Sequence, residues 1–201
     1  MCTAITFKTN DTYFGRNLDL EYNYNESVTI TPRNYPIKFY QKGNLNQHLA
    51  IIGMAYVVDN YPLYYDAINE KGLGIAGLNF PNNAYYTNHV KNLDNIASFE
   101  FIPWVLSQCE DVDDVYALLK RLNLVNIDFS DNLPLSPLHW IVADQNQSIT
   151  IESTKEGLKV YDNPVGVLTN NPSFDYHMLN LNNYLHLSVK NPNNEFSRFL
   201  S

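Results

Sequence analysis

The first half of the chain alternates apolar and polar residues over short stretches, which predicts β-structure. The stretches 3–7 and 13–18 flank the polar cluster 8–12, a pattern typical of a β-hairpin. The run 49–58 is rich in Ile, Val and Met, so we expect a strand buried on both faces. A second hairpin is predicted around Asn69-Glu70-Lys71-Gly72. The strands expected in this half cover residues 3–7, 13–18, 28–31, 49–58, 64–68 and 73–78.

The middle of the chain changes to a helical period. Ser98 is placed to cap a helix over 99–108, and Asp111 is placed to cap a second helix. The apolar positions at helical spacing in this second helix are Val115, Leu118, Leu119 and Leu122. Residues 132–137 read as a loop with two prolines. The elements expected after that loop are strands at 138–143, 148–152, 158–161 and 166–169 and a helix over 174–187.

The order of these elements is strands, then two helices, then strands again. This order favours an α+β fold with two sheets and helices packed outside, and it argues against an alternating parallel fold. The length of 201 residues fits one domain over 1–201. The chain ends shortly after the polar linker 191–194. A sheet-rich protein rarely stops on a linker, so we expect a chain that is truncated at its C-terminus.

Composition removes several classes of function. Thirteen basic residues against twenty-one acidic ones give a formal net charge of −8, which argues against nucleic-acid binding. No apolar run reaches eighteen residues, so no membrane span is expected. The N-terminus lacks the pattern of a secretory signal and only two cysteines are present, which predicts a cytoplasmic protein. The five histidines lack ligand spacing, so neither a metal nor a cofactor is predicted.

Cys2 is the first residue that carries candidate chemistry. Initiator methionine is normally removed when the next residue is small, and removal here would leave a thiol and a free α-amine on one residue. A free α-amine titrates near ~8 and a thiol near ~8.5. The amine is then a usable base at neutral pH, and the thiolate is the reactive nucleophile. Taken alone, a cysteine at this position equally fits an incidental buried thiol.

Two charged residues follow in the strand predicted to pair with the N-terminus. If the turn centres near Asn10, antiparallel pairing puts residue 2 opposite about residue 18. Arg16 and Asp19 then lie beside Cys2, where Arg16 would stabilise a thiolate and Asp19 would hold the ammonium. Residues 16 and 19 point to opposite faces of a regular strand, so a bend or bulge is required for both to reach Cys2.

Five motifs in one order make the pattern specific. They are Met1-Cys2-Thr3, Phe14-Gly15-Arg16-Asn17-Leu18-Asp19, Asn69-Glu70-Lys71-Gly72-Leu73-Gly74, Ala76-Gly77-Leu78-Asn79-Phe80-Pro81 and Val167-Leu168-Thr169-Asn170-Asn171-Pro172. Together they closely resemble the choloylglycine hydrolase family of the N-terminal nucleophile hydrolases, which contains conjugated bile salt hydrolases and penicillin V acylases. The similar segments span residues 2 to about 187. The resemblance implies a four-layer αββα sandwich.

The resemblance also implies roles. Cys2 matches the nucleophile, Arg16 and Asp19 match residues that line it, and Asn79 and Asn170 match the asparagines that position the amide and the oxyanion. Asn79 favours bile salt hydrolases, because penicillin-preferring members usually carry Tyr there. Arg16 and Asn79 also belong to the implied substrate site. The positions that match the steroid-binding loops are Leu18, Tyr22, Val58, Phe129, Leu133 and Leu138, and each of these six also fits ordinary core packing.

The implied activity is hydrolysis of a linear amide, with glycine or taurine released from a cholyl conjugate through a Cys2 thioester. The alternatives are a penicillin V acylase or an N-acyl-homoserine lactone acylase with the same mechanism, and a truncated, non-catalytic relic. The resemblance also implies a homotetramer. Family members carry a further arginine after a Pro-Gly-Asp stretch. Ser197-Arg198-Phe199 is similar to its surroundings but lacks that stretch, so no role passes to Arg198.

Two other patterns are rejected. The segment 72–77 matches the dinucleotide-binding fingerprint, but Pro81 and the asparagines after it read as a loop where that fingerprint needs a helix. Cys109 with His139 could suggest a cysteine protease. Cys109 lies in a predicted helix without a flanking signature, so a packed thiol is the better interpretation.

Overall fold

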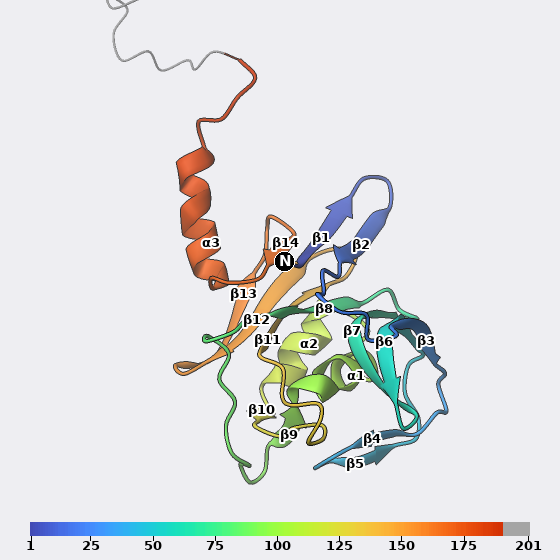
Figure 1. Ribbon diagram of the computed structural model, residues 1–201. Helices are drawn as coiled ribbons and strands as arrows, with labels where there is room; N and C mark the ends of the chain where they lie inside the picture. The colour runs from blue at the N-terminus through green and yellow to red at the C-terminus, as the bar shows by residue number, and fades with distance from the viewer. Residues whose placement is uncertain (191–201) are drawn as a thin grey trace, which may run out of the picture.

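A seven-stranded antiparallel sheet forms the centre of the computed structural model, which describes residues 1–190 (Figure 1). Its strand order is β13-β12-β11-β8-β7-β6-β3. The strands are β3 (Ser27–Thr31), β6 (Ile51–Val58), β7 (Tyr61–Asn69), β8 (Gly74–Asn79), β11 (Leu138–Ala143), β12 (Ser148–Thr154) and β13 (Gly157–Asp162). The hairpin expected around residues 69–72 is present as β7–β8, and β11 and β12 also pair as an antiparallel hairpin. Gly72 closes the first at a φ of 89°, a conformation that favours glycine.

A smaller sheet in the order β14-β1-β2 lies on one face of the large sheet. Its strands are β1 (Thr3–Lys8), β2 (Thr12–Asn17) and β14 (Val167–Thr169). The predicted N-terminal hairpin is confirmed, because β1 pairs with β2 from Thr3 opposite Asn17 to Lys8 opposite Thr12. Two further pairs are β4 (Ile37–Phe39) with β5 (Gly43–Leu45), and β9 (Asp94–Ala97) with β10 (Leu122–Val125).

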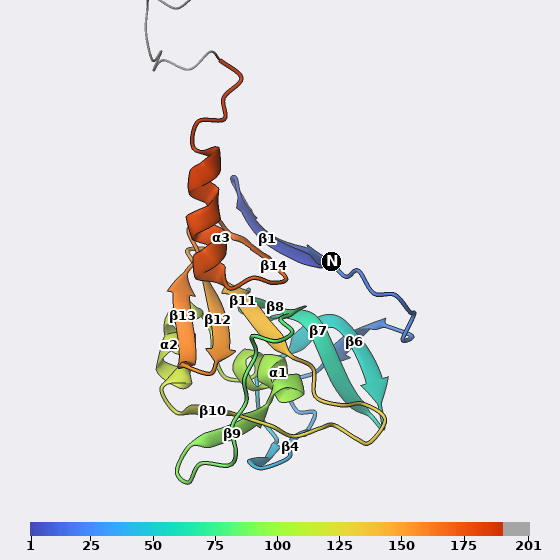
Figure 2. The ribbon, with the colours of Figure 1, turned by 60° about the vertical axis from the view of Figure 1, so that its left-hand side comes forward.

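The helices supply the outer layers. Helices α1 (Phe101–Leu106) and α2 (Val112–Leu119) cover the face of the large sheet opposite to the small sheet (Figures 1 and 2). Helix α3 (Phe174–Leu181) follows β14, and its residues Phe174 and Met178 pack against the core between the two sheets (Figure 2). The 3₁₀ turns Ser98–Glu100 and Asn182–Tyr184 complete the helical elements of residues 1–190. The layers follow the order α, β, β, α, as expected for an N-terminal nucleophile hydrolase. No helix within these residues is long and apolar enough to cross a membrane.

Two apolar cores hold the layers together. The larger core lies between the helices and the large sheet, where the rings of Phe101 and Trp140 pack with centroids 4.3 Å apart. The smaller core lies between the two sheets and includes Cys2, Leu78 and Ile141. Trp140 and Ile141 are neighbours on β11 that enter different cores, because successive side chains of a strand point to opposite faces. The large sheet therefore contributes side chains from one face to the larger core and from the other face to the smaller core.

The prediction that 49–58 is buried on both faces is wrong. Ile51 and Ala55 of β6 are buried against the helices, whereas Ile52 and Val57 are each 42% exposed. The small sheet contacts the large one at β8 and β11, so the outer face of β6 is not covered by it. Apolar composition alone does not distinguish a strand covered on two faces from one covered on a single face.

Helix boundaries and caps differ from the prediction at four points. The first helix, expected over 99–108, is α1 over Phe101–Leu106. Asp111 caps α2 as expected, accepting a hydrogen bond from the Asp114 N–H at 2.9 Å. Leu122, however, belongs to β10, because the chain leaves the helix after Leu119 and pairs in parallel with β9. Ser98 makes no capping bond; the Glu100 carboxylate accepts from the Ala97 N–H at 2.9 Å instead. The last helix ends at residue 181, short of the predicted 187.

Candidate active site

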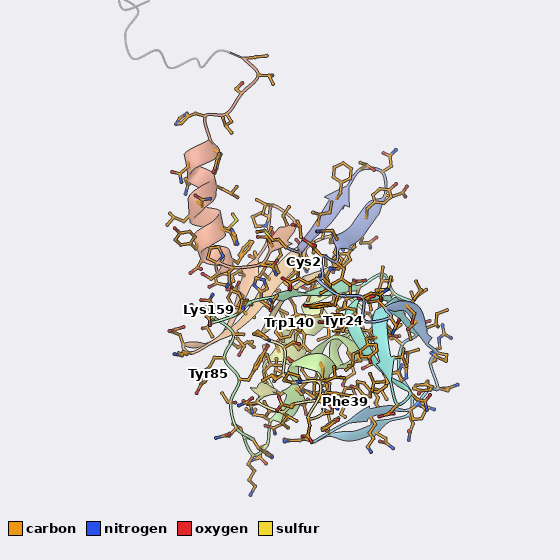
Figure 3. All side chains as sticks on the ribbon, viewed as in Figure 1. Cys2, Tyr24, Phe39, Tyr85, Trp140 and Lys159 are labelled. Atoms are coloured by element: carbon orange, nitrogen blue, oxygen red, sulfur yellow. The ribbon has the colours of Figure 1, made fainter. Side chains whose placement is uncertain are left out.

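Cys2 lies directly before β1, between the two sheets, and is only 7% exposed (Figure 3). The hairpin register continues from Thr3 opposite Asn17, so Cys2 comes opposite Leu18, as the sequence predicted. Leu18 packs against the same inter-sheet core that holds Cys2. The backbone N–H of Cys2 donates to Oδ1 of Asn170 at 2.6 Å. Cys2 is therefore held by the side chain of Asn170, which lies 168 positions away in the sequence.

Asn170 joins three strand ends. It follows β14, and while its Oδ1 binds Cys2, its Nδ2 donates to the backbone carbonyl of Asn79 at 2.8 Å. Asn79 is the last residue of β8. One amide thus connects the N-terminus, the end of β14 and the end of β8, and the three predicted residues Cys2, Asn79 and Asn170 meet at one place.

Arg16 is buried on β2, opposite Ala4. Its side chain is 5% exposed, and Nη1 donates to the carbonyls of Tyr65 at 3.3 Å and Gly77 at 3.1 Å. The Asp66 carboxylate lies 3.8 Å from the same nitrogen. Burial raises the pKa of the Asp66 carboxyl, and the nearby guanidinium opposes part of this rise. The large sheet therefore supplies both carbonyl acceptors and a partial counter-charge for this buried cation.

Asp19 lies two residues beyond the end of β2, outside the regular pleat. Its side chain is 61% exposed, whereas the Arg16 side chain is 5% exposed. The Asp19 carboxylate binds the α-ammonium of Met1 and raises its pKa, while Met1 itself is 80% exposed. Asp19 thus contacts the amine of residue 1, and Asn170 contacts the nitrogen of residue 2.

The six residues matched to steroid-binding loops occupy two regions. Leu18 lies near Cys2, Leu138 pairs with Asn79, and the exposed Tyr22 is in the segment after β2. The other region holds Val58, Phe129 and Leu133. Its rings pack closely, with Phe129 5.6 Å from Tyr61 and 5.3 Å from Phe99 between centroids. Val58 pairs with Tyr61, and Leu133 belongs to the same loop as Phe129 through a bridge to Ser130.

Sequence reasoning missed two fully buried polar residues, His139 and Glu152. Each side chain is 0% exposed, and His139 Nδ1 lies 3.0 Å from Glu152 Oε1.

The rejected pairing of His139 with Cys109 is not formed, because Cys109 lies in the helix-side core and His139 faces the small sheet. Burial raises the pKa of the Cys109 thiol to about 12, so this thiol is inert. Glu152 lies at an inward position of the strand predicted over 148–152, and this position could have indicated the buried pair from the sequence.

Comparison with known proteins identifies the family. The family model for linear amide C–N hydrolases of the choloylglycine hydrolase family matches residues 2–200. The chain belongs to the choloylglycine hydrolase family. Arg198, which the sequence left without a role, lies within this match but outside the residues that the structure describes.

Relatives within the choloylglycine hydrolase family are close in sequence but longer. A bile salt hydrolase/transferase from Lactiplantibacillus plantarum is 60% identical over 197 residues, which cover 98% of this chain and 61% of the relative. A conjugated bile acid hydrolase from Lactobacillus gasseri is 46% identical over 188 residues, covering 92% of this chain and 60% of the relative. The chain therefore spans about three-fifths of the length of the curated relatives that it matches.

Two solved structures share the fold of this chain. A mutant of the conjugated bile acid hydrolase from Clostridium perfringens superimposes with a TM-score of 0.89 at 42% identity, covering 94% of this chain and 59% of that one. A penicillin V acylase from Agrobacterium tumefaciens gives a TM-score of 0.71 at 18% identity, covering 91% and 56% of the two chains. The second likeness shows the fold alone.

Proposed function

We propose that this chain carries the nucleophile of a conjugated bile salt hydrolase, which releases glycine or taurine from cholyl conjugates. The observation that carries the proposal is the hydrogen-bonded path from the Cys2 nitrogen through Asn170 to Asn79, at 2.6 and 2.8 Å. It brings together the residues that nucleophilic amide hydrolysis needs: a thiol, the nitrogen of its own residue, and amide donors. The names of the relatives support the substrate class.

The proposed reaction begins after Met1 is removed, which its 80% exposure favours. The freed α-amine of Cys2 accepts the thiol proton, directly or through water. The thiolate forms a C–S bond to the amide carbonyl carbon, and the C=O electron pair moves to the oxygen. Collapse of this intermediate breaks the C–N bond, and the leaving amine takes the proton from the α-ammonium. Water then hydrolyses the thioester, which releases the bile acid and restores the thiol.

Asn170 and Asn79 are proposed to orient the amine and to donate hydrogen bonds to the oxyanion. Asn170 Oδ1 already accepts from the Cys2 nitrogen, so it can orient the amine with its lone pair toward the sulfur. Asn170 Nδ2 has two hydrogens, of which one is used by the Asn79 carbonyl. The second hydrogen and the Asn79 side-chain amide are the proposed donors to the oxyanion. One such donor typically contributes about 2.7–4 kcal/mol to the transition state.

Arg16 and Asp19 are proposed to control charge around the nucleophile. The buried guanidinium is proposed to stabilise the negative charge that develops at the nucleophile during the reaction. Asp19 binds the ammonium of Met1, and we propose that it takes over the ammonium of Cys2 once Met1 has left. The ammonium that Asp19 binds would then belong to Cys2 and no longer to Met1.

The apolar body of the substrate is proposed to contact both regions described above. Leu18 packs against the core that holds Cys2, and Leu138 pairs with Asn79 while its side chain packs against the helix-side core. The aromatic cluster around Phe129 offers a larger apolar surface for a steroid. The proposed contacts are Leu18, Tyr22, Val58, Phe129, Leu133 and Leu138, with Arg16 and Asn79 toward the amide.

The decisive experiment is made on the full-length protein. Mass spectrometry should find Met1 absent, and iodoacetamide should label Cys2 but not Cys109, because Cys109 is buried with a pKa of about 12. Cys2→Ser should abolish glycocholate hydrolysis, whereas the matched Cys109→Ser variant should keep it. Full turnover by Cys2→Ser would overturn the mechanism. Retained Met1 with an unreactive Cys2 would instead identify a non-catalytic relic.

The acyl group is decided by initial rates on glycocholate, phenoxymethylpenicillin and an N-acyl-homoserine lactone. The proposal expects glycocholate to react fastest, in keeping with Asn79 at the position where penicillin-preferring members usually carry Tyr. Preference for either other substrate would assign the alternative activity.

Assembly and compartment complete the proposal. We propose a cytoplasmic homotetramer, as the family resemblance implies. Both cysteines are free and buried, which fits a reducing compartment. Light scattering of the full-length protein tests the tetramer, and a monomeric mass would refute it.

A further inference from the structure

His139 on β11 and Glu152 on β12 form a titratable pair that the proposed mechanism does not use. Both side chains are 0% exposed, and Nδ1 lies 3.0 Å from Oε1. Burying two such groups costs free energy unless they are paired and hydrogen-bonded. An apolar pair of similar size would pack the same space at lower cost. The groups that His139 and Glu152 contact outside the pair therefore indicate what the pair does.

The pair reaches both ends of the loop that carries Asn170. His139 Nε2 lies 2.8 Å from the Thr169 carbonyl, and since a carbonyl oxygen only accepts, Nε2 is the donor. Glu152 Oε1 accepts from the Phe174 N–H at 2.9 Å, at the start of α3. Residues 170–173 are thus anchored before and after by one buried pair.

The same imidazole also contacts the chain next to Asn79. The Phe80 ring, fully buried, stacks on the His139 ring at 4.2 Å between centroids and 7° between planes. Phe80 follows Asn79 directly, and its N–H donates to the Pro137 carbonyl at 2.8 Å. His139 therefore contacts both neighbours of the proposed oxyanion donors: the residue before Asn170 and the residue after Asn79.

The tautomer of His139 depends on Glu152. With Nε2 holding a proton for Thr169, Nδ1 and Oε1 need one shared proton to approach at 3.0 Å. The pair carries no net charge whether this proton is on the carboxyl group or on the ring. Glu152 thus keeps the Nε2 proton directed at Thr169 without leaving a net buried charge.

We propose that His139 and Glu152 are positioning residues that fix Asn170 between Cys2 and Asn79. This role rests on the proposed function of those three residues. The Asn170 amide must hold Oδ1 toward the Cys2 nitrogen and Nδ2 toward Asn79 at the same time. A small rotation of its loop would lose one of the two contacts, and misplacement of a reacting group by about 1 Å can cost about 100-fold in rate.

Two substitutions of His139 separate hydrogen bonding from packing. His139→Phe keeps a planar ring against Phe80 but removes the donor to Thr169. His139→Gln loses the ring but retains a terminal N–H that can reach the Thr169 carbonyl. A positioning role predicts that His139→Phe lowers kcat by about 10- to 100-fold with KM within about twofold. His139→Gln should then recover much of the loss, whereas a packing role predicts the opposite order.

The rate at which iodoacetamide alkylates Cys2 provides a readout that needs no substrate. It should slow in His139→Phe because the amine that activates the thiol is less well oriented. Failure of the wild-type protein to hydrolyse glycocholate would refute the proposed function, and the alkylation rates would still test the positioning role. Trp140→Phe, at the neighbouring fully buried position on β11, is the matched control for lost stability and should keep both rates.

A double-mutant cycle tests the path of action. If His139 acts through Asn170, His139→Phe should have little further effect in an Asn170→Ala background, because coupled residues are not additive. All measurements are made on full-length protein that chemical denaturation shows to be folded. Wild-type kcat and alkylation in His139→Phe, or effects that multiply in the double variant, would overturn the inference.

Discussion

Asn69 offers the sharpest stability prediction, because one buried amide uses all its hydrogen-bonding capacity. The side chain is 4% exposed at the end of β7. Its Nδ2 donates to the carbonyl of Leu106, the last residue of α1, at 3.0 Å and to that of Cys109 at 2.8 Å. Its Oδ1 accepts from the backbone N–H groups of Lys71 at 3.0 Å and Leu73 at 3.1 Å. Asn69 therefore ties the β7–β8 turn to the end of α1.

The size of the effect follows from these four bonds. Asn69→Ala removes two N–H donors and the one oxygen that accepts two hydrogen bonds, and each net hydrogen bond contributes about 0.5–1.5 kcal/mol. Lys71 is exposed, so water replaces that bond, whereas Leu73 is fully buried and its N–H stays unpaired. We expect the free energy of unfolding to fall by about 3–5 kcal/mol. Asn69→Asp should cost more at neutral pH, because a carboxylate oxygen would face two carbonyls.

Urea unfolding followed by tryptophan fluorescence measures this difference, with the midpoint and slope compared between variants. Asn34→Ala is the matched control, since Asn34 is an exposed turn residue and should change the unfolding free energy by less than about 0.5 kcal/mol. A loss below about 1 kcal/mol in Asn69→Ala, with an unchanged slope, would refute the claim that the amide ties the two elements.

Three further predictions concern local features. Asp111→Ala removes the cap to Asp114 and should lower the unfolding free energy of the chain by about 1 kcal/mol in urea; no change would contradict the capping role. The Arg33 ion pair lowers the pKa of Glu70 to about 2, so its contribution is complete above the ordinary value of 4.5 and is lost as pH falls toward 2. The stability difference between wild type and Glu70→Gln should therefore shrink between pH 5 and 2, and a pH-independent difference would be inconsistent with the pair. Gly72→Ala places a side chain at a φ of 89° and should lower the melting temperature, at a cost of about 1–2 kcal/mol; an unchanged melting temperature would contradict that strain.

Local pattern was enough for several elements. The polar cluster 8–12 fixed both the hairpin and its register, because a short antiparallel turn leaves little freedom for the pairing of its strands. Cys2 opposite Leu18 followed from that register. The Asp111 cap was likewise readable, because it depends on a side chain and a backbone N–H only three residues apart.

The predictions for Leu122 and for the run 49–58 were wrong because contacts with segments distant in sequence outweighed the local pattern. Leu122 fits the helical period, but its segment forms a parallel pair with β9, whose existence cannot be read from the segment itself. The run 49–58 is apolar enough for a doubly buried strand. Its outer face is exposed because the small sheet contacts β8 and β11 instead.

Local sequence patterns were enough to predict the residue types of the candidate site, the hairpin that bears Cys2 and Arg16, and the family. Tertiary structure decided that Asn170 meets Cys2 across 168 positions and that His139 and Glu152 lie beneath it. The physical reason is range. Turn geometry, capping and side-chain period act within a few residues, whereas contacts between sheets depend on how whole layers pack, and no local pattern encodes that packing.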